Sequence, residues 1–298
     1  MSEKATGWTI SRVLVGAVLI SFSAILVPLA GVSPALAAFY RVAIGGIALL
    51  IFAWLRGESM LLKPRFLFYV SAAGFAFAVD LVFWHMSIYR VGPGIATLLA
   101  NFQVVLMAIS GWLFWRERLR WGVVSGIFLA LIGLLLIVIT APGGGHRAFL
   151  SGIGYGLISA LAYACYLLVL RLAGGGETQH APAFYMGLVS FATAIPLALW
   201  LLVESRSFVV PHLHSWLWLL LYGLGPQAAG WLLISIALPR MPMALAGLLL
   251  LLQPALTFEW AHLIFYRRFT ALELIGAGLA LVGLYLGIRF RQARFKAI

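Results

Sequence analysis

Charged residues are scarce in this sequence. They make up 9% of its 298 residues, whereas 64% of the residues are hydrophobic. A typical soluble domain carries about 25% charged residues. The mean hydropathy is +1.07. This composition excludes an ordinary soluble domain and indicates a membrane protein.

Cysteine and catalytic motifs are also nearly absent. The single cysteine, Cys165, excludes an intrachain disulfide. The sequence has no phosphate-binding glycine loop followed by Lys and Ser/Thr, no His-Glu-x-x-His and no Gly-x-Ser-x-Gly. Glu259 and His262 have the spacing of metal ligands, but the further carboxylates of such a site are missing. We therefore expect no ATP hydrolysis, no enzyme activity, no cofactor and no metal.

Ten apolar segments are each long enough to cross a bilayer, which takes about 20 residues in a helix. They lie at 10–30, 35–55, 67–89, 93–115, 121–140, 150–172, 181–203, 213–238, 242–265 and 270–289. Turn residues separate them in "GVSP" (31–34), "VGPG" (91–94), "APGGGHR" (141–147), "AGGGETQHAP" (173–182) and "PRMP" (239–242). Only helices satisfy their own backbone groups in lipid, so an all-α membrane protein is predicted. The first span is expected to be retained rather than removed as a signal peptide.

Basic residues are distributed unevenly between the two sides of the predicted bundle. Fourteen of the 20 Lys and Arg residues lie in segments on the side of the N-terminus, and five lie on the other side. This bias predicts a multi-pass protein of the cell inner membrane with both termini in the cytoplasm. The net charge of +12 then reflects topology, and no nucleic-acid partner is expected. A monomer is compatible with the sequence.

The chain contains an internal repeat. An offset of 150 residues aligns five unusual matches without a gap: Arg90 with Arg240, Gln103 with Gln253, Arg118 with Arg268, Gly126 with Gly276, and Gly133 with Gly283. It also superposes the fourth span on the ninth and the fifth on the tenth. We therefore predict two five-helix halves, 1–145 and 146–298. Because five is odd, the second half enters the membrane from the opposite side, as in many secondary transporters.

The repeated segments resemble a known family. "ATLLANFQVVLMAISGWLFWRERLRWGVVSGIFLALIGLLLIV" (96–138) and "AGLLLLLQPALTFEWAHLIFYRRFTALELIGAGLALVGLYL" (246–286) are similar to the paired repeats of the drug/metabolite transporter superfamily, in its ten-helix EamA-type branch. That pattern has a central proline and an acid after the helix. The first half has Glu117 but Val104 for the proline, and the second has Pro254 but Arg267 for the acid. Within the superfamily, the chain most resembles bacterial exporters of aromatic amino acids.

Asp80 is an acid in the middle of the third span, where a charge is costly and needs a partner. Its neighbours one helical turn away are Phe77 and Trp84, so that face suits a substrate with an ammonium group and an apolar ring. Two other roles stay open: a structural pair with Arg41 of the second span, or a proton carrier. The small residues near Arg41, which include Gly45, predict close packing of that helix.

Further polar and aromatic residues in the spans are candidates for the substrate site. His85 lies beside Trp84 and binds either substrate or a backbone carbonyl. Gln103 and Gln253 are related by the repeat and lie either at the cavity walls, at the hinge between the halves or in an interhelical hydrogen bond. Tyr163 of the sixth span, with Tyr166 one turn on, either lines the cavity or serves packing.

The eighth span carries "YGLGPQAAGW" (222–231). Gly223, Gly225 and Pro226 weaken the helix, which predicts either a broken helix whose free backbone groups hold substrate or a simple proline kink. Gln227 and Trp231 are then expected to face Asp80 across a central cavity. Pro254 and Glu259 of the ninth span are candidate gating residues, and Glu259 is expected to hydrogen-bond His262 near the outer end.

Together these features predict a secondary transporter that works by alternating access. Its expected substrates are small amphipathic metabolites, most of all amino acids including aromatic ones. A multidrug or cation exporter of the same fold and a passive metabolite channel stay open as alternatives.

Overall fold

The computed structural model describes residues 3–58, 64–139, 146–173, 181–204, 207–265 and 270–289. Within them the chain is helical. The first half contains α1 (Glu3–Ser21), α2 (Ser23–Ala30), α3 (Pro34–Leu55), α4 (Pro64–Ala100), α5 (Gln103–Trp115) and α6 (Trp121–Val138). The second half contains α7 (His146–Ala173), α8 (Pro182–Val203), α9 (Leu213–Tyr222), η2 (Gly223–Gly230), α10 (Trp231–Ala237), η3 (Leu238–Arg240), α11 (Met243–Leu250), α12 (Leu252–Phe265) and α13 (Ala271–Arg289).

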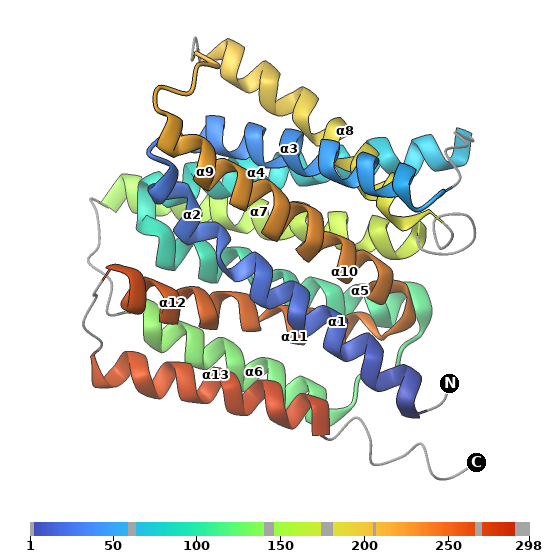
Figure 1. The fold of residues 1–298 in the computed structure, drawn as a ribbon. Helices are drawn as coiled ribbons and strands as arrows, with labels where there is room; N and C mark the ends of the chain where they lie inside the picture. Colours follow the sequence, from blue (N-terminus) through green and yellow to red (C-terminus); the bar gives the residue numbers. More distant parts are fainter. Residues whose placement is uncertain are drawn as a thin grey trace.

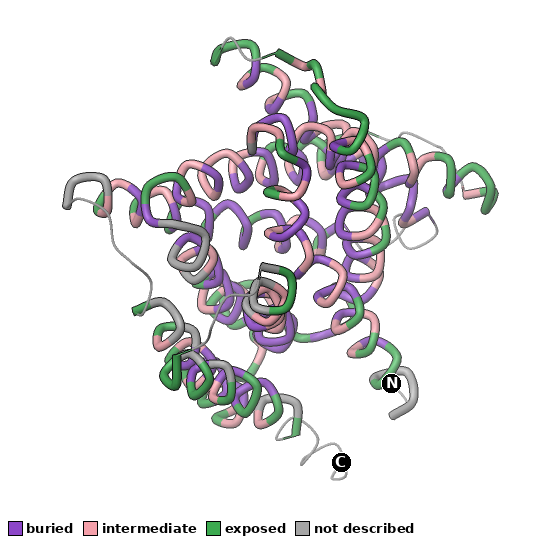
Figure 2. The backbone as a smooth tube through the Cα atoms, turned by 60° about the vertical axis from the view of Figure 1, so that its left-hand side comes forward, coloured by how far each residue is buried: buried purple, intermediate pink, exposed green. Residues whose placement is uncertain are grey.

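These elements reproduce the ten predicted spans. Six stretches of the described chain are long and apolar enough to cross a membrane, among them Gly7–Ala30 and Leu213–Arg240, which several shorter elements build in succession. Four shorter apolar helices supply the rest: Gln103–Trp115, Trp121–Gly133, Met243–Thr257 and Leu274–Leu286. Buried residues gather towards the middle of the bundle, and exposed residues lie on its outer faces (Figure 2). The all-α membrane fold is thus confirmed.

The two halves run in opposite directions. The start of α1 and the end of α13 lie at one end of the bundle, which we call the terminal face (Figure 1). The first helix of the second half, α7, starts at the opposite end, the distal face (Figure 1). This arrangement is the inverted repeat that the odd number of spans predicted.

One junction was expected to be a loop and is not. The "VGPG" segment at 91–94 lies inside α4, whose backbone stays helical from Pro64 to Ala100. The chain nevertheless reverses direction there, as the contacts of Gly156 show. A Cβ atom on Gly156 would lie 3.1 Å from Ser87 Oγ and 2.6 Å from Leu99 Cβ, so these two residues of α4 are close together. In a straight helix those two residues would be about 18 Å apart. The sequence therefore predicted the reversal of the chain correctly, but its prediction of a non-helical loop at 91–94 was wrong. In the same way, the helix α7 already includes His146 from the predicted 141–147 break.

The closing helices of the halves, α6 and α13, pack side by side at one edge of the bundle (Figure 1). A Cβ atom on Gly133 would overlap the Gly276 carbonyl oxygen and the Ala280 nitrogen. A Cβ atom on Gly283 would likewise overlap the backbone of Gly126 and Ala130. The residues of α6 in these contacts are related to those of α13 by the 150-residue offset. The contact is therefore a two-fold crossing in which glycine lets two backbones touch.

We expect Gly133→Ala to destabilise this crossing. The added methyl group meets backbone atoms that cannot rotate away, so the helices must separate, at a cost of about 1 to 3 kcal/mol. The measurement is the Tm of the protein purified in detergent, which should fall by several degrees. Gly283→Ala should lower the Tm equally. Gly278→Ala is the matched control, since no atom lies within 4 Å of its Cβ position; equal Tm values for Gly133→Ala and this control would contradict the two-fold contact.

Candidate functional site

A cavity of about 590 Å³, a volume that includes the space towards its mouth, lies between the two halves. Its polar lining residues are Ser23, Arg41, Asp80, Thr97, Asn101, Gln253 and Thr257. Its aromatic lining residues are Phe77, Trp84, Tyr163 and Trp231, and its other lining residues are Ile20, Ala24, Leu81, Ala100 and Pro254.

The cavity lies in the half of the bundle nearer the distal face. Its lining includes Ser23 of α2, which carries the first span towards that face, and Thr97, just after the reversal of α4. On the side of the terminal face, α11 packs directly on α5. Val104 and Met107 of α5 are fully buried there, and both lie against Gly247 of α11. The space between the cavity and the terminal face is therefore filled by the packing of α5 on α11.

Five of the residues expected to bind substrate meet in this lining: Asp80, Trp84, Tyr163, Trp231 and Gln253. They come from four different spans: Asp80 and Trp84 from α4, Tyr163 from α7, Trp231 from α10 and Gln253 from α12. Their proximity follows from the structure, and their role in binding stays a prediction.

Asp80 is held by a neutral partner. Its Oδ1 accepts a hydrogen bond of 2.6 Å from the Ser159 hydroxyl of α7, and its side chain is almost fully buried. Asp80 and Arg41 both line the cavity, yet they form no ion pair in the described part of the chain. The structural pair considered from the sequence is therefore not observed.

Arg41 is held by polar groups of the eighth span. Its Nε donates to Gln227 Oε1 at 2.9 Å and its Nη1 donates to the Tyr222 hydroxyl at 3.1 Å. Gln227 Nε2 in turn donates to Ser190 Oγ at 3.0 Å. The guanidinium carbon lies 5.4 Å from the Phe77 ring centre and 4.9 Å from that of Tyr222, within the range of cation–π contacts.

A close crossing of α3 and η2 produces this arrangement. A Cβ atom on Gly45 would overlap Gln227, and one on Gly223 would lie 2.6 Å from Ile44 Cγ2. Arg41 lies one turn before Gly45, and Gln227 lies one turn after Gly223, so the two side chains meet beside the crossing. The close packing of the second span was predicted from its small residues, and Gly223 acts here as a packing residue.

The middle of the eighth span is not a broken helix. Gly223–Gly230 is a π-helical segment of 8 residues that joins α9 to α10. Pro226 lies within it, and proline removes one backbone donor and clashes with the preceding turn of an α-helix. Widening to a π-helix relieves that clash while the chain stays helical, so the expected free backbone groups are replaced by a continuous wider turn. The Cβ position of Gly225 has no atom within 4 Å, which leaves this glycine without a packing role.

Three residues expected at the cavity lie behind its walls. His85 is 1% exposed, and its Nδ1 lies 2.6 Å from the Leu81 carbonyl oxygen, as in the alternative considered from the sequence. Gln103 and Gln227 are both 0% exposed and do not line the cavity. Gln227 positions Arg41 instead. Both amide atoms of Gln103 are buried without a partner among the described residues.

The two repeat-related glutamines thus occupy different environments. Gln253 lines the cavity and its Nε2 lies 3.5 Å from the Tyr163 hydroxyl, whereas Gln103 is sealed away. Pro254 also lines the cavity, whereas its counterpart Val104 is fully buried. The expected hydrogen bond of Glu259 involves His262, whose side chain lies outside the described residues, so it stays a prediction.

Aromatic rings pack beneath the charged groups. Phe77 stacks on Tyr166 with ring centres 4.5 Å apart, and Trp231 meets the edges of Phe77, Tyr166 and Tyr163 at 5.4, 4.8 and 5.9 Å. Tyr166 is fully buried and packs behind the lining, whereas Tyr163 reaches the cavity. The cluster provides an apolar wall next to Asp80 and Arg41.

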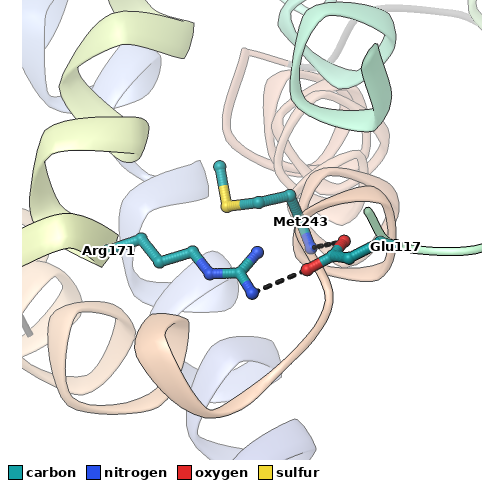
Figure 3. A network of polar contacts seen from close by, with 3 residues as sticks. All are labelled: Glu117, Arg171 and Met243. Carbon is teal, nitrogen blue, oxygen red and sulfur yellow. Dashed lines mark hydrogen bonds and ion pairs between the residues drawn. The ribbon is translucent and has the colours of Figure 1, made fainter. Parts of the chain in front are cut away.

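Sequence reasoning missed a polar network at the terminal face, shown in Figure 3. Glu117 Oε1 pairs with Arg171 Nη2 of α7 at 2.6 Å, and Glu117 Oε2 accepts from the Met243 backbone N–H at 2.9 Å. The Arg171 guanidinium lies 4.1 Å from the Trp115 ring centre. We call Glu117, Arg171 and Met243 the terminal clasp, because they join α7 and the start of α11 to the segment after α5. The signal in the sequence was the acid of the family pattern, but nothing identified its partners.

A second carboxylate spans the halves at the same face. Glu58, which follows α3, accepts hydrogen bonds from the backbone N–H groups of Ala183 and Phe184 at 3.4 and 2.9 Å. These groups lie in the first turn of α8, where a negative charge is favourable. Glu58 and Glu117 therefore both lie in loops of the first half and accept hydrogen bonds from the first turns of helices in the second half, α8 and α11.

Comparison with known proteins finds one transporter family in both halves of the chain. The model of the EamA-like transporter family matches residues 7–139 and 150–289, one match in each half. The chain is 26% identical over 236 residues to a probable amino-acid metabolite efflux pump of Escherichia coli (strain K12), covering 75% of this chain and 76% of the relative. A protein of the same description from Salmonella typhimurium is 26% identical and is covered over 69% of its length, with 67% of this chain aligned.

Structural comparison supports the fold. A solved crystal structure superposes with a TM-score of 0.79 and covers 94% of this chain and 98% of its own, at 21% sequence identity.

Proposed function

This chain belongs to the EamA-like transporter family, and we propose that it exports small amphipathic metabolites, above all amino acids including aromatic ones. The observation that carries the proposal is the cavity between inverted halves, which places Asp80 and Arg41 beside a cluster of aromatic rings. Charged groups in a membrane bundle are costly and mark substrate pathways. The description of the relatives as probable amino-acid metabolite efflux pumps supports the same substrate class.

The proposed mechanism is alternating access. We infer that the cavity opens towards the distal face, because its lining lies nearer that face and α5 packs on α11 between it and the terminal face. With the termini in the cytoplasm of the inner membrane, as the distribution of basic residues predicts, this conformation faces outward. Rocking of one half against the other would close the distal side and open the terminal side. The same site would then load substrate from the cytoplasm.

Counterflow in liposomes tests this function. Purified protein is reconstituted with unlabelled phenylalanine inside, and labelled phenylalanine is added outside at a low concentration. We expect transient accumulation of label above the outside concentration, with a rate that saturates, because a carrier exchanges substrate through one alternating site. Protein-free liposomes are the control.

The alternatives give different results in the same assay. A passive channel equilibrates the label without accumulation, and a multidrug or cation exporter shows counterflow of an aromatic amine or a quaternary ammonium compound but not of any amino acid. Either result would replace the proposed function.

A further inference from the structure

The cavity contains two opposite charges that are not paired with each other. Asp80 on α4 is bound by a serine hydroxyl, and Arg41 on α3 is bound by an amide and a phenol. All three partners are neutral. Opposite charges attract strongly in a low-dielectric site and would otherwise pair. Because the neutral partners hold Asp80 and Arg41 apart, each charge is available to a charged ligand.

Both charged groups have unused hydrogen-bonding atoms. Arg41 uses Nε and Nη1, and its Nη2 donates to no described residue. Asp80 uses Oδ1, and its Oδ2 accepts from no described residue. Neither atom is among the fully buried unpaired atoms, and both residues line the cavity, so a ligand can reach both. Guanidinium prefers a carboxylate, and carboxylate prefers an ammonium group.

The surroundings of the two groups add to this selectivity. Trp84, one turn after Asp80, lines the cavity, and an aromatic ring near the carboxylate favours a bound cation. Trp231 also lines the cavity, and its Nε1 is buried without a partner among the described residues. Unpaired buried donors are rare in proteins and call for an acceptor.

We propose that the cavity selects zwitterions: Arg41 binds the carboxylate of the substrate, Asp80 binds its ammonium group, and the aromatic cluster receives its apolar side chain. Gln227 and Tyr222 are then positioning residues that fix the guanidinium. This inference rests on the proposed export function and goes beyond it, because it makes Arg41 a specificity-determining residue that rejects simple amines. A cation in this cavity would leave Arg41 without a counter-charge, and an anion would leave Asp80 without one.

Competition against counterflow of labelled phenylalanine tests the proposal. Three unlabelled competitors share the benzyl group: phenylalanine, phenethylamine, which lacks the carboxylate, and 3-phenylpropionate, which lacks the ammonium group. For the parent protein, we expect the half-inhibitory concentration of phenylalanine to be at least about tenfold below those of the other two, as for loss of one charge-assisted hydrogen bond. Equal inhibition by phenethylamine and phenylalanine would overturn the proposal.

The variant Arg41→Gln identifies the residue responsible. It keeps polar atoms near Gln227 but removes the charge, so the preference for phenylalanine over phenethylamine should fall to within about threefold, well below one charge-assisted hydrogen bond. The preference over 3-phenylpropionate should be kept or increased. A uniform loss of rate with unchanged preferences would assign Arg41 a structural role and overturn the proposal.

If Arg41→Gln does not transport, the same three compounds are compared by the Tm increase that each gives to the detergent-purified variant and parent, which requires binding only. The parent should be stabilised most by phenylalanine, and Arg41→Gln should lose that distinction from phenethylamine. Absence of counterflow with every amino acid would instead contradict the proposed function itself, so the two failures are distinguishable.

Discussion

Replacing Asp80 with asparagine is expected to reduce phenylalanine counterflow by at least about tenfold, the factor that loss of a charge-assisted hydrogen bond of 1.5 to 3 kcal/mol implies. Asparagine has the size of aspartate and an oxygen that can still accept from the Ser159 hydroxyl. The helix contact between α4 and α7 should therefore survive. The negative charge is lost, and with it the group that binds the substrate's ammonium.

The measurement is the initial counterflow rate per reconstituted protein. Size-exclusion profile and Tm establish that Asp80→Asn is folded and monodisperse. Glu204→Gln is the matched control, because it also removes one carboxylate but lies at the exposed end of α8, away from the cavity. Equal rates for Asp80→Asn and the parent would remove Asp80 from the mechanism.

The sequence predicted those parts of this fold that lipid imposes. Unpaired backbone groups are so costly in a bilayer that each apolar segment of sufficient length must be a helix, whatever its neighbours. Part of the evidence for the offset of 150 residues was a steric requirement, because the crossing of α6 and α13 leaves no room for a Cβ atom at Gly133 or at its counterpart Gly283. A position that only glycine can occupy stays recognisable in both halves even though the apolar residues around it differ.

The orientation of single side chains was harder to predict. His85 and Asp80 are in the same helix, yet only Asp80 faces the cavity, because the rotation of α4 is set by its packing against α7. Gln227 was expected to bind substrate, but the crossing at Gly45 directs it to Arg41. The π-helical segment depends on how the chain resolves the clash at Pro226, which composition alone does not determine.

Symmetry explains another error. Gln103 and Gln253 are equivalent in the repeat, so the sequence placed both at the cavity. The structure separates them, because Gln253 of α12 lines the cavity, whereas Gln103 is fully buried at the start of α5, the helix that packs on α11. In an inverted repeat the two halves exchange conformations when access alternates. Gln103, now buried with no partner among the described residues, is expected to reach the cavity in the opposite state.

Breaking the terminal clasp should populate that opposite state. In Glu117→Gln, the amide oxygen can still accept from the Met243 N–H, but the charge that pairs with Arg171 is gone. The two side chains are only 16% and 11% exposed, so water replaces the pair poorly. We expect the closed terminal face to lose at least about 1.4 kcal/mol, a tenfold change in the equilibrium between states.

Cysteine accessibility measures this shift. In a Cys165→Ser background, a cysteine replaces Leu248, which is fully buried in α11 and follows Gly247, the residue that lies against α5. Addition of Glu117→Gln should raise its rate of reaction with a membrane-impermeant maleimide at least about tenfold, in proportion to the open population. Glu204→Gln should leave the rate unchanged. An unreactive Leu248→Cys site in Glu117→Gln would show that the closure does not depend on this charge.

A double-mutant cycle then tests whether Glu117 and Arg171 stabilise the closed terminal face through their ion pair or independently of each other. If Glu117 and Arg171 act through their ion pair, Arg171→Gln alone should increase the reaction rate about as much as Glu117→Gln, and the double variant should add little to either. Additive increases would mean that each residue holds the face through other contacts, such as the packing of Arg171 on Trp115. Because the pair joins a loop of the first half to helices of the second, the cycle tests directly whether the halves separate at the terminal face.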